Sequence, residues 1–161
     1  MTNSIDKTII VRHFLASLAY HANKAIRDAP TSYPELDIGH GIRTPRQILH
    51  HITGVLSYAH SFYEHYDTTY FHDKSWNEEV AHFYETLRKL DKSMAEKSPN
   101  KVTIQRLLQG PLSDAMAHTG QLLMLRRFAG SPVPAENFLM ADIRAGIVGP
   151  NQPDPVAPNR K

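Results

Sequence analysis

The stretch Gly110-Pro-Leu-Ser-Asp-Ala-Met-Ala-His-Thr-Gly-Gln-Leu-Leu-Met-Leu-Arg-Arg127 carries more information about this chain than any other segment. Pro111 suits the first turn of a helix, where its missing N–H leaves no bond unmade. Apolar residues then recur on two sides, which indicates a helix packed between neighbours. Two arginines complement the helix dipole at its end, and Gly130 followed by Pro132 is a typical stop. The stretch predicts a helix from Pro111 to about Ala129.

Three segments before it also show apolar residues at the three- and four-residue spacing of amphipathic helices. They cover about residues 4–27, 45–66 and 76–94. The second follows a T-x-x-Q capping box, Thr44 to Gln47, and the third follows an S-x-x-E box, Ser75 to Glu78. Shorter helical turns are expected at residues 103–109 and 136–144.

The chain shows neither the alternation typical of strands nor an internal repeat, so the predicted fold class is all-α. Four amphipathic helices with one long first connection predict an antiparallel up-and-down four-helix bundle over residues 1–145. Prolines at positions 150, 153, 155 and 158 predict an extended tail over residues 146–161.

Composition narrows the function classes. The 161 residues fit one domain, and no apolar run reaches the roughly 18–20 residues that cross a bilayer, so we expect no membrane contact. The amino terminus lacks a secretory h-region, which predicts a cytoplasmic location. A net charge of +2 without a basic stripe argues against a nucleic-acid partner. The chain has no cysteine, so any metal must be held by nitrogen and oxygen.

The same decisive stretch contains a candidate metal site. Asp114 and His118 are four residues apart, which places them on one face of a helix. A histidine pair, His50 and His51, lies on the predicted second helix. At 100° per residue, His51 falls at the edge of the apolar arc of that helix, whereas His50 falls on the polar side and is expected to face water. The sequence therefore predicts a divalent cation held by His51, Asp114 and His118, with coordination positions left open.

An acid and a histidine at this spacing also form ordinary surface ion pairs, and Glu78 with His82 repeats the spacing without a reason to invoke a metal. The remaining histidines are expected to be solvated or bonded locally. A pH sensor built from the ten histidines is disfavoured because they are scattered around the helices.

The chain resembles the DinB/YfiT-like superfamily of helical bundles. The resemblance rests on Arg43-Thr-Pro-Arg-Gln-Ile-Leu-His-His-Ile52 and on Asp114-Ala-Met-Ala-His-Thr-Gly-Gln-Leu122. In that family the later helix commonly reads H-x-x-x-H-x-G-Q-L, and here Asp114 replaces the first histidine. The resemblance implies a zinc, nickel or iron ion at His51, Asp114 and His118. It also implies a thiol-dependent transferase or a hydrolase that acts on a small molecule.

Such an enzyme needs a proton acceptor besides the ligands. The candidates are Glu136, Tyr58 and Asp142, although Tyr58 is also a candidate core aromatic. Gln121 is a candidate for orienting His118. The alternative function is a non-catalytic helical binding or stress-response protein, as a homodimer, in which the histidines are incidental.

Overall fold

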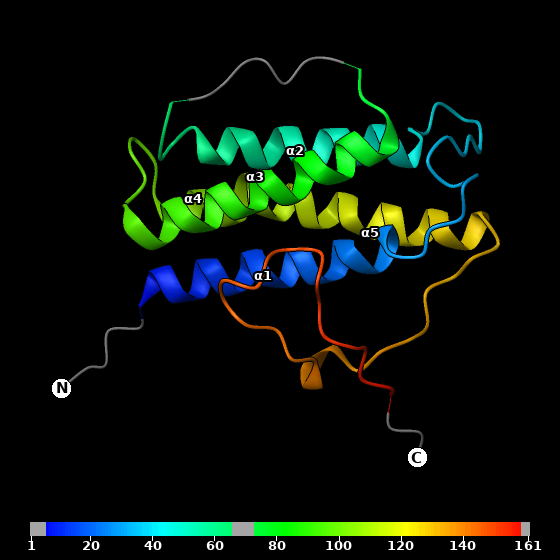
Figure 1. Cartoon of the computed structure of the whole chain (residues 1–161). Helices are drawn as coiled ribbons and strands as arrows, with labels where there is room; N and C mark the ends of the chain where they lie inside the picture. The colour runs from blue at the N-terminus through cyan, green and yellow to red at the C-terminus, as the bar shows by residue number, and fades with distance from the viewer. Residues whose placement is uncertain (1–5, 66–72, 159–161) are drawn as a thin grey trace.

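The computed structural model describes residues 6–65 and 73–158 (Figure 1). The long helices of these residues are α1 (Lys7–Ile26), α2 (Pro45–His60), α3 (Trp76–Glu96) and α5 (Ser113–Phe128). Short α4 (Ile104–Leu107) and the π-helical turn η2 (Leu108–Leu112) lead into α5, and the 3-10 turn η3 (Phe138–Met140) follows it. No strand occurs in the described residues, so the predicted all-α class is confirmed.

The predicted capping boxes fix the starts of α2 and α3. The Thr44 N–H donates to the Gln47 side chain at 2.9 Å, and the Thr44 hydroxyl accepts from the Gln47 N–H. Ser75 and Glu78 form the same reciprocal pair. The predicted end of the second helix near Tyr66 lies outside the described residues, and α2 itself ends at His60.

The order of helix directions differs from the predicted up-and-down bundle. His50, early in α2, pairs with Glu79, early in α3, at 2.7 Å. His60, at the end of α2, bonds Ser93, near the end of α3, at 3.0 Å. These contacts make α2 and α3 parallel, and Figure 1 shows α1 and α5 running the opposite way. The strictly alternating order is therefore wrong, because the long connection after α2 allows a return to the other end of the bundle.

The core lies between the four long helices. Its fully buried side chains are mostly leucines and isoleucines with single aromatics, each contributing about 1.5–3 kcal/mol of burial free energy. They include Leu15, Leu18, Ile52, Leu56, Phe83, Leu87, Leu90 and Leu122. None of these helices within the described residues has the length and apolarity to cross a bilayer.

Arg126 joins the ends of α1 and α5. Its guanidinium is 4% exposed and donates to the backbone carbonyls of Ala25, Arg27, Asp28 and Ser131. These carbonyls lie where helices end and lack intrahelical partners. The buried charge is therefore fully hydrogen-bonded and stabilises one end of the bundle.

The chain after α5 forms a strap, defined here as residues 130–158, that crosses α1 (Figure 1). The Asn137 N–H donates to the Val156 carbonyl at 2.8 Å, and the Asn23 amide of α1 donates to the Pro150 carbonyl at 3.0 Å. Of the short helix expected within residues 136–144, the structure forms the single turn η3. The backbone hydrogen bonds of this segment instead hold the strap to itself and to α1.

Candidate metal centre

A kink places Asp114 at the start of α5. Gly110 has non-helical angles (φ −96°, ψ −106°), and Pro111 follows it inside η2. The helix predicted to begin at Pro111 therefore begins at Ser113, whose hydroxyl donates to the Leu108 carbonyl at 2.6 Å. Asp114 lies in the first turn of α5, where a carboxylate interacts favourably with the helix dipole.

The structure brings the three predicted ligands together across the α2–α5 seam. His51 projects from α2, and Asp114 and His118 project from α5. One donor atom from each lies within 4.8 Å of the others. The His51 and His118 rings meet edge to face, with centroids 4.4 Å apart. Among the described residues this is the one group of three acidic or imidazole side chains close enough to share an ion.

The separations within the group lie between long hydrogen bonds and the spacing of ligands around a cation. His51 Nε2 lies 3.3 Å from Asp114 Oδ2, and His118 Nε2 lies 3.5 Å from Asp114 Oδ1. Hydrogen bonds from N–H to oxygen are usually about 2.7–3.2 Å long. Ligands about 2.1 Å from a tetrahedral ion lie about 3.4 Å from one another. An ion could bind between the imidazoles and the carboxylate once the three donor atoms, which lie within 4.8 Å of one another, draw closer together.

Gln121 sets the orientation of His118. His118 Nδ1 lies 2.8 Å from Gln121 Oε1, one turn further along α5. Because an amide oxygen only accepts, Nδ1 carries the proton in this hydrogen bond. Nε2 of the neutral ring then presents a lone pair toward the Asp114 carboxylate. A cation or an additional proton is therefore needed between Nε2 and the carboxylate. The hydrogen bond from His118 to Gln121 is the ligand-orienting contact expected around a metal.

The electrostatics around His51 favour its neutral, metal-binding form. Burial, followed by the nearby His118 and the Arg43 guanidinium, lowers the pKa of His51 below its usual range, and the hydrogen bond to Asp114 opposes this only in part. Asp114 remains 48% exposed at its side chain, so the cluster is open to solvent and to a small substrate.

His50 is in part exposed to water, as expected, with 36% of its side chain accessible. In addition, its Nδ1 lies 2.7 Å from Oε1 of Glu79, a carboxylate that is 1% exposed in α3. This contact was not foreseen, because α2 packs against α3 on one side and against α5 on the other. The two adjacent histidines therefore serve different neighbours, with His51 directed to α5 as predicted.

The three candidate proton acceptors are not gathered at the cluster. The Glu136 carboxylate accepts from Tyr20 and Lys24 of α1 and from the Val156 N–H, and is fully buried between the strap and α1. Asp142 forms an exposed ion pair with Arg144. Glu136 and Asp142 are thus already engaged elsewhere.

Tyr58 lies on the same side of α2 as His51, seven residues further along, which corresponds to about 10 Å. Its side chain is 56% exposed, so the core interpretation is wrong. It lines a cleft at the end of α2.

Sequence reasoning missed Arg43. The residue lies just before the α2 capping box, and its charge reaches His51 from a connection that shows no helical periodicity. The one available signal was its place two residues before the start of the predicted helix that carries His51.

Comparisons with known proteins add no name to this geometry. No family model, no curated protein and no solved structure matches the chain.

Proposed function

We propose that this chain is a DinB-like metal-dependent enzyme that binds one divalent ion, zinc, nickel or iron, through His51, Asp114 and His118. The observation that carries the proposal is the convergence of their three donor atoms within 4.8 Å. The Asp114–imidazole separations of 3.3 and 3.5 Å, close to a tetrahedral ligand spacing, support it.

The reaction class is transfer of a low-molecular-weight thiol, or hydrolysis, on a small molecule in the cytoplasm. When bound, an ion with open positions supplies a Lewis acid that lowers the pKa of water or of a thiol. His51 and His118 keep neutral nitrogens available, Gln121 fixes the His118 ring, and the exposed side of Asp114 leaves room for a substrate. Arg43 adds positive potential beside His51, which favours an anionic nucleophile such as a thiolate.

Elemental analysis of tag-free protein after dialysis against a weak chelator tests the metal. We expect about one divalent ion per chain in the native protein and in His13→Ala, an exposed histidine of α1, and none in His118→Ala. Circular dichroism of each variant establishes that the bundle is folded. Equal metal in all three proteins would contradict the ligand assignment.

Turnover tests the enzyme assignment separately. The metal-loaded protein is incubated with small thiols and electrophiles, and with a set of ester and amide substrates. Turnover that requires the ion and disappears in His118→Ala would support the proposal. Bound metal without any metal-dependent turnover would favour the non-catalytic binding protein instead.

A further inference from the structure

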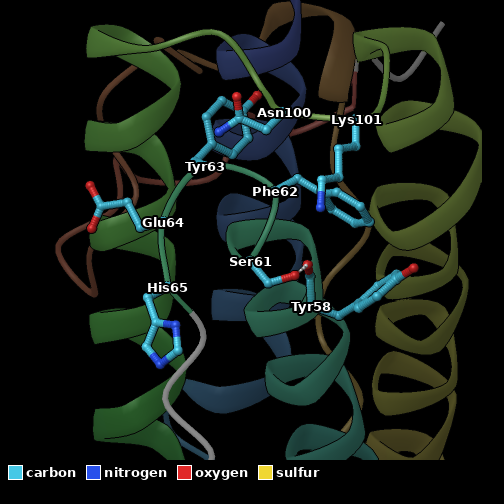
Figure 2. Close-up of a pocket in the computed structure, with 8 residues that line it drawn as sticks. All are labelled: Tyr58, Ser61, Phe62, Tyr63, Glu64, His65, Asn100 and Lys101. Carbon is cyan, nitrogen blue, oxygen red and sulfur yellow. Dashed lines mark hydrogen bonds between the residues drawn. The ribbon is translucent and has the colours of Figure 1, made fainter.

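A cleft of about 750 Å³ lies at the end of α2, away from the candidate metal centre (Figure 2). We call it the α2-end cleft. Its walls come from the end of α2, the turn that follows, and the loop after α3, and they include Tyr58, Phe62, Tyr63, Glu64, Asn100 and Lys101.

One wall of the cleft is aromatic. The Tyr58 and Phe62 rings meet edge to face, with centroids 5.1 Å apart. Tyr58 is 56% exposed and Phe62 is half-buried against the core, so both offer apolar surface to a ligand. Aromatic rings prefer offset or edge-to-face contacts with another ring, which favours a flat ligand here.

The charge of the cleft comes from Lys101. Glu64, the acid of the lining, already accepts from Lys97 at 2.7 Å and from Ser93 at 3.1 Å. In Figure 2 Glu64 points away from Lys101, whose side chain extends into the space beside Phe62. Within the part of the chain that the structure describes, Lys101 forms no ion pair. The cleft therefore presents one uncompensated ammonium group.

The loop that carries Lys101 is held in place. The Asn100 N–H donates to the Phe62 carbonyl at 2.6 Å, which fastens the loop to the aromatic wall. Lys101 has a φ of +62°, in the left-handed region that costs about 1 kcal/mol or more for a residue other than glycine. This strained backbone places the ammonium next to the rings before any ligand arrives.

We propose that the α2-end cleft binds a small aromatic carboxylate. The ring of the ligand packs against Phe62 and Tyr58, and its carboxylate accepts hydrogen bonds from the Lys101 ammonium. The inference does not depend on the metal, because none of these contacts involves a candidate ligand. It goes beyond the proposed function by assigning a second binding site to the chain.

Calorimetry or ligand-observed NMR with the tag-free full chain tests the proposal. The probes are 2-naphthoate, its neutral analogue 2-naphthylmethanol, and acetate, which lacks a ring. We expect 2-naphthoate to bind about tenfold more tightly than the alcohol, because a charged hydrogen bond distinguishes them. Acetate should not bind measurably.

Variants locate the site. Lys101→Gln should weaken 2-naphthoate binding about tenfold. Lys101→Arg keeps the charge and should not weaken binding. The control Lys92→Gln on α3 removes the same charge elsewhere and should not weaken binding either. Phe62→Leu should weaken it about fivefold, since an aromatic contact is replaced by an aliphatic one. Binding should persist in His118→Ala, so that loss of the metal centre and absence of this site are distinguishable.

Equal affinity for the acid and the alcohol would overturn the proposal, as would equal weakening by Lys92→Gln. Absence of 2-naphthoate binding at millimolar concentration in folded native protein would also overturn it.

Discussion

Two carboxylates of this chain lie in opposite kinds of surroundings. Glu136, in the strap, is fully buried and accepts from the Tyr20 hydroxyl, the Lys24 ammonium and the Val156 N–H. Asp114, in α5, is 48% exposed and lies 3.3 and 3.5 Å from two imidazole nitrogens. Both were functional candidates in the sequence, as a proton acceptor and as a metal ligand.

The difference distinguishes a carboxylate that stabilises the fold from a carboxylate that could ligate a metal. Glu136 has its donors within the protein, so another proton or cation would disturb a complete network. Asp114 has only a long hydrogen bond with His51, at 3.3 Å, and lies 3.5 Å from Nε2 of His118. That nitrogen presents a lone pair, because Gln121 holds the proton on the other side of the His118 ring. We infer that Glu136 holds the strap to α1 and that Asp114 is available to bind a cation.

Glu136→Gln should have the largest effect on stability. The substitution keeps the shape of the side chain but leaves the Lys24 ammonium, 9% exposed, without its countercharge. Breaking a buried ion pair by removing one partner costs about 3–5 kcal/mol. Chemical denaturation measures this loss, and metal content should stay unchanged. A change below about 1 kcal/mol would mean that the strap does not depend on this pair.

Asp114→Asn should show the reverse pattern. We expect metal affinity to fall about a hundredfold or more, since a structural zinc site with four ligands, worth about 10–16 kcal/mol in all, gives each ligand about 2.5–4 kcal/mol. The stability of the metal-free protein should change by less than about 1 kcal/mol, because the side chain is half exposed. Competition titration with a chromogenic chelator reports the affinity. Unchanged affinity would remove Asp114 from the site.

Gln121→Ala should weaken metal binding by about 10–100-fold, because the hydrogen bond that orients His118 is lost. Gln121→Glu keeps an acceptor for the Nδ1 proton and is the matched control. Equal loss in both variants would show that the contact with His118 does not matter.

The smallest expected effect is a loss of strap stability at acid pH. Although burial opposes it, hydrogen bonds from Lys24 and Tyr20 hold the pKa of Glu136 below its usual range. A lowered pKa in the folded state adds stability above the ordinary glutamate value of about 4.3, and this stability is lost as the pH falls through the folded pKa. The protection of the Asn137 amide against hydrogen exchange, relative to an unfolded chain at the same pH, should therefore fall below about pH 4 before that of the bundle amides. Simultaneous loss of protection would contradict a separate strap.

Much of the fold was predictable because its signals are local. The capping boxes at Thr44 and Ser75 fixed two helix starts, and apolar spacing identified the long helices. Helix direction was not predictable, because the parallel packing of α2 on α3 depends on pairs such as His50 with Glu79, 29 residues apart. The strap has no periodicity, and its contacts with α1 join residues more than a hundred positions apart.

The candidate site, like the fold, was predictable where its signals are local and not where they depend on distant residues. Asp114 and His118 share a helix face by spacing alone, and the angular position of His51 correctly directed it inward to α5. The bond of His50 to Glu79 was missed, because a helix packed against two neighbours has no simple polar face. The position of Glu136 and the α2-end cleft depend on loops, where neighbouring residues in space are distant in sequence.

The most direct test is a crystal structure of tag-free protein soaked with zinc or nickel, with anomalous data at the metal edge. We predict one strong anomalous peak about 2.1 Å from Nε2 of His51, from Nε2 of His118 and from an Asp114 oxygen. The absence of a peak, with the imidazoles closing onto Asp114 at ordinary hydrogen-bond length, would contradict the account.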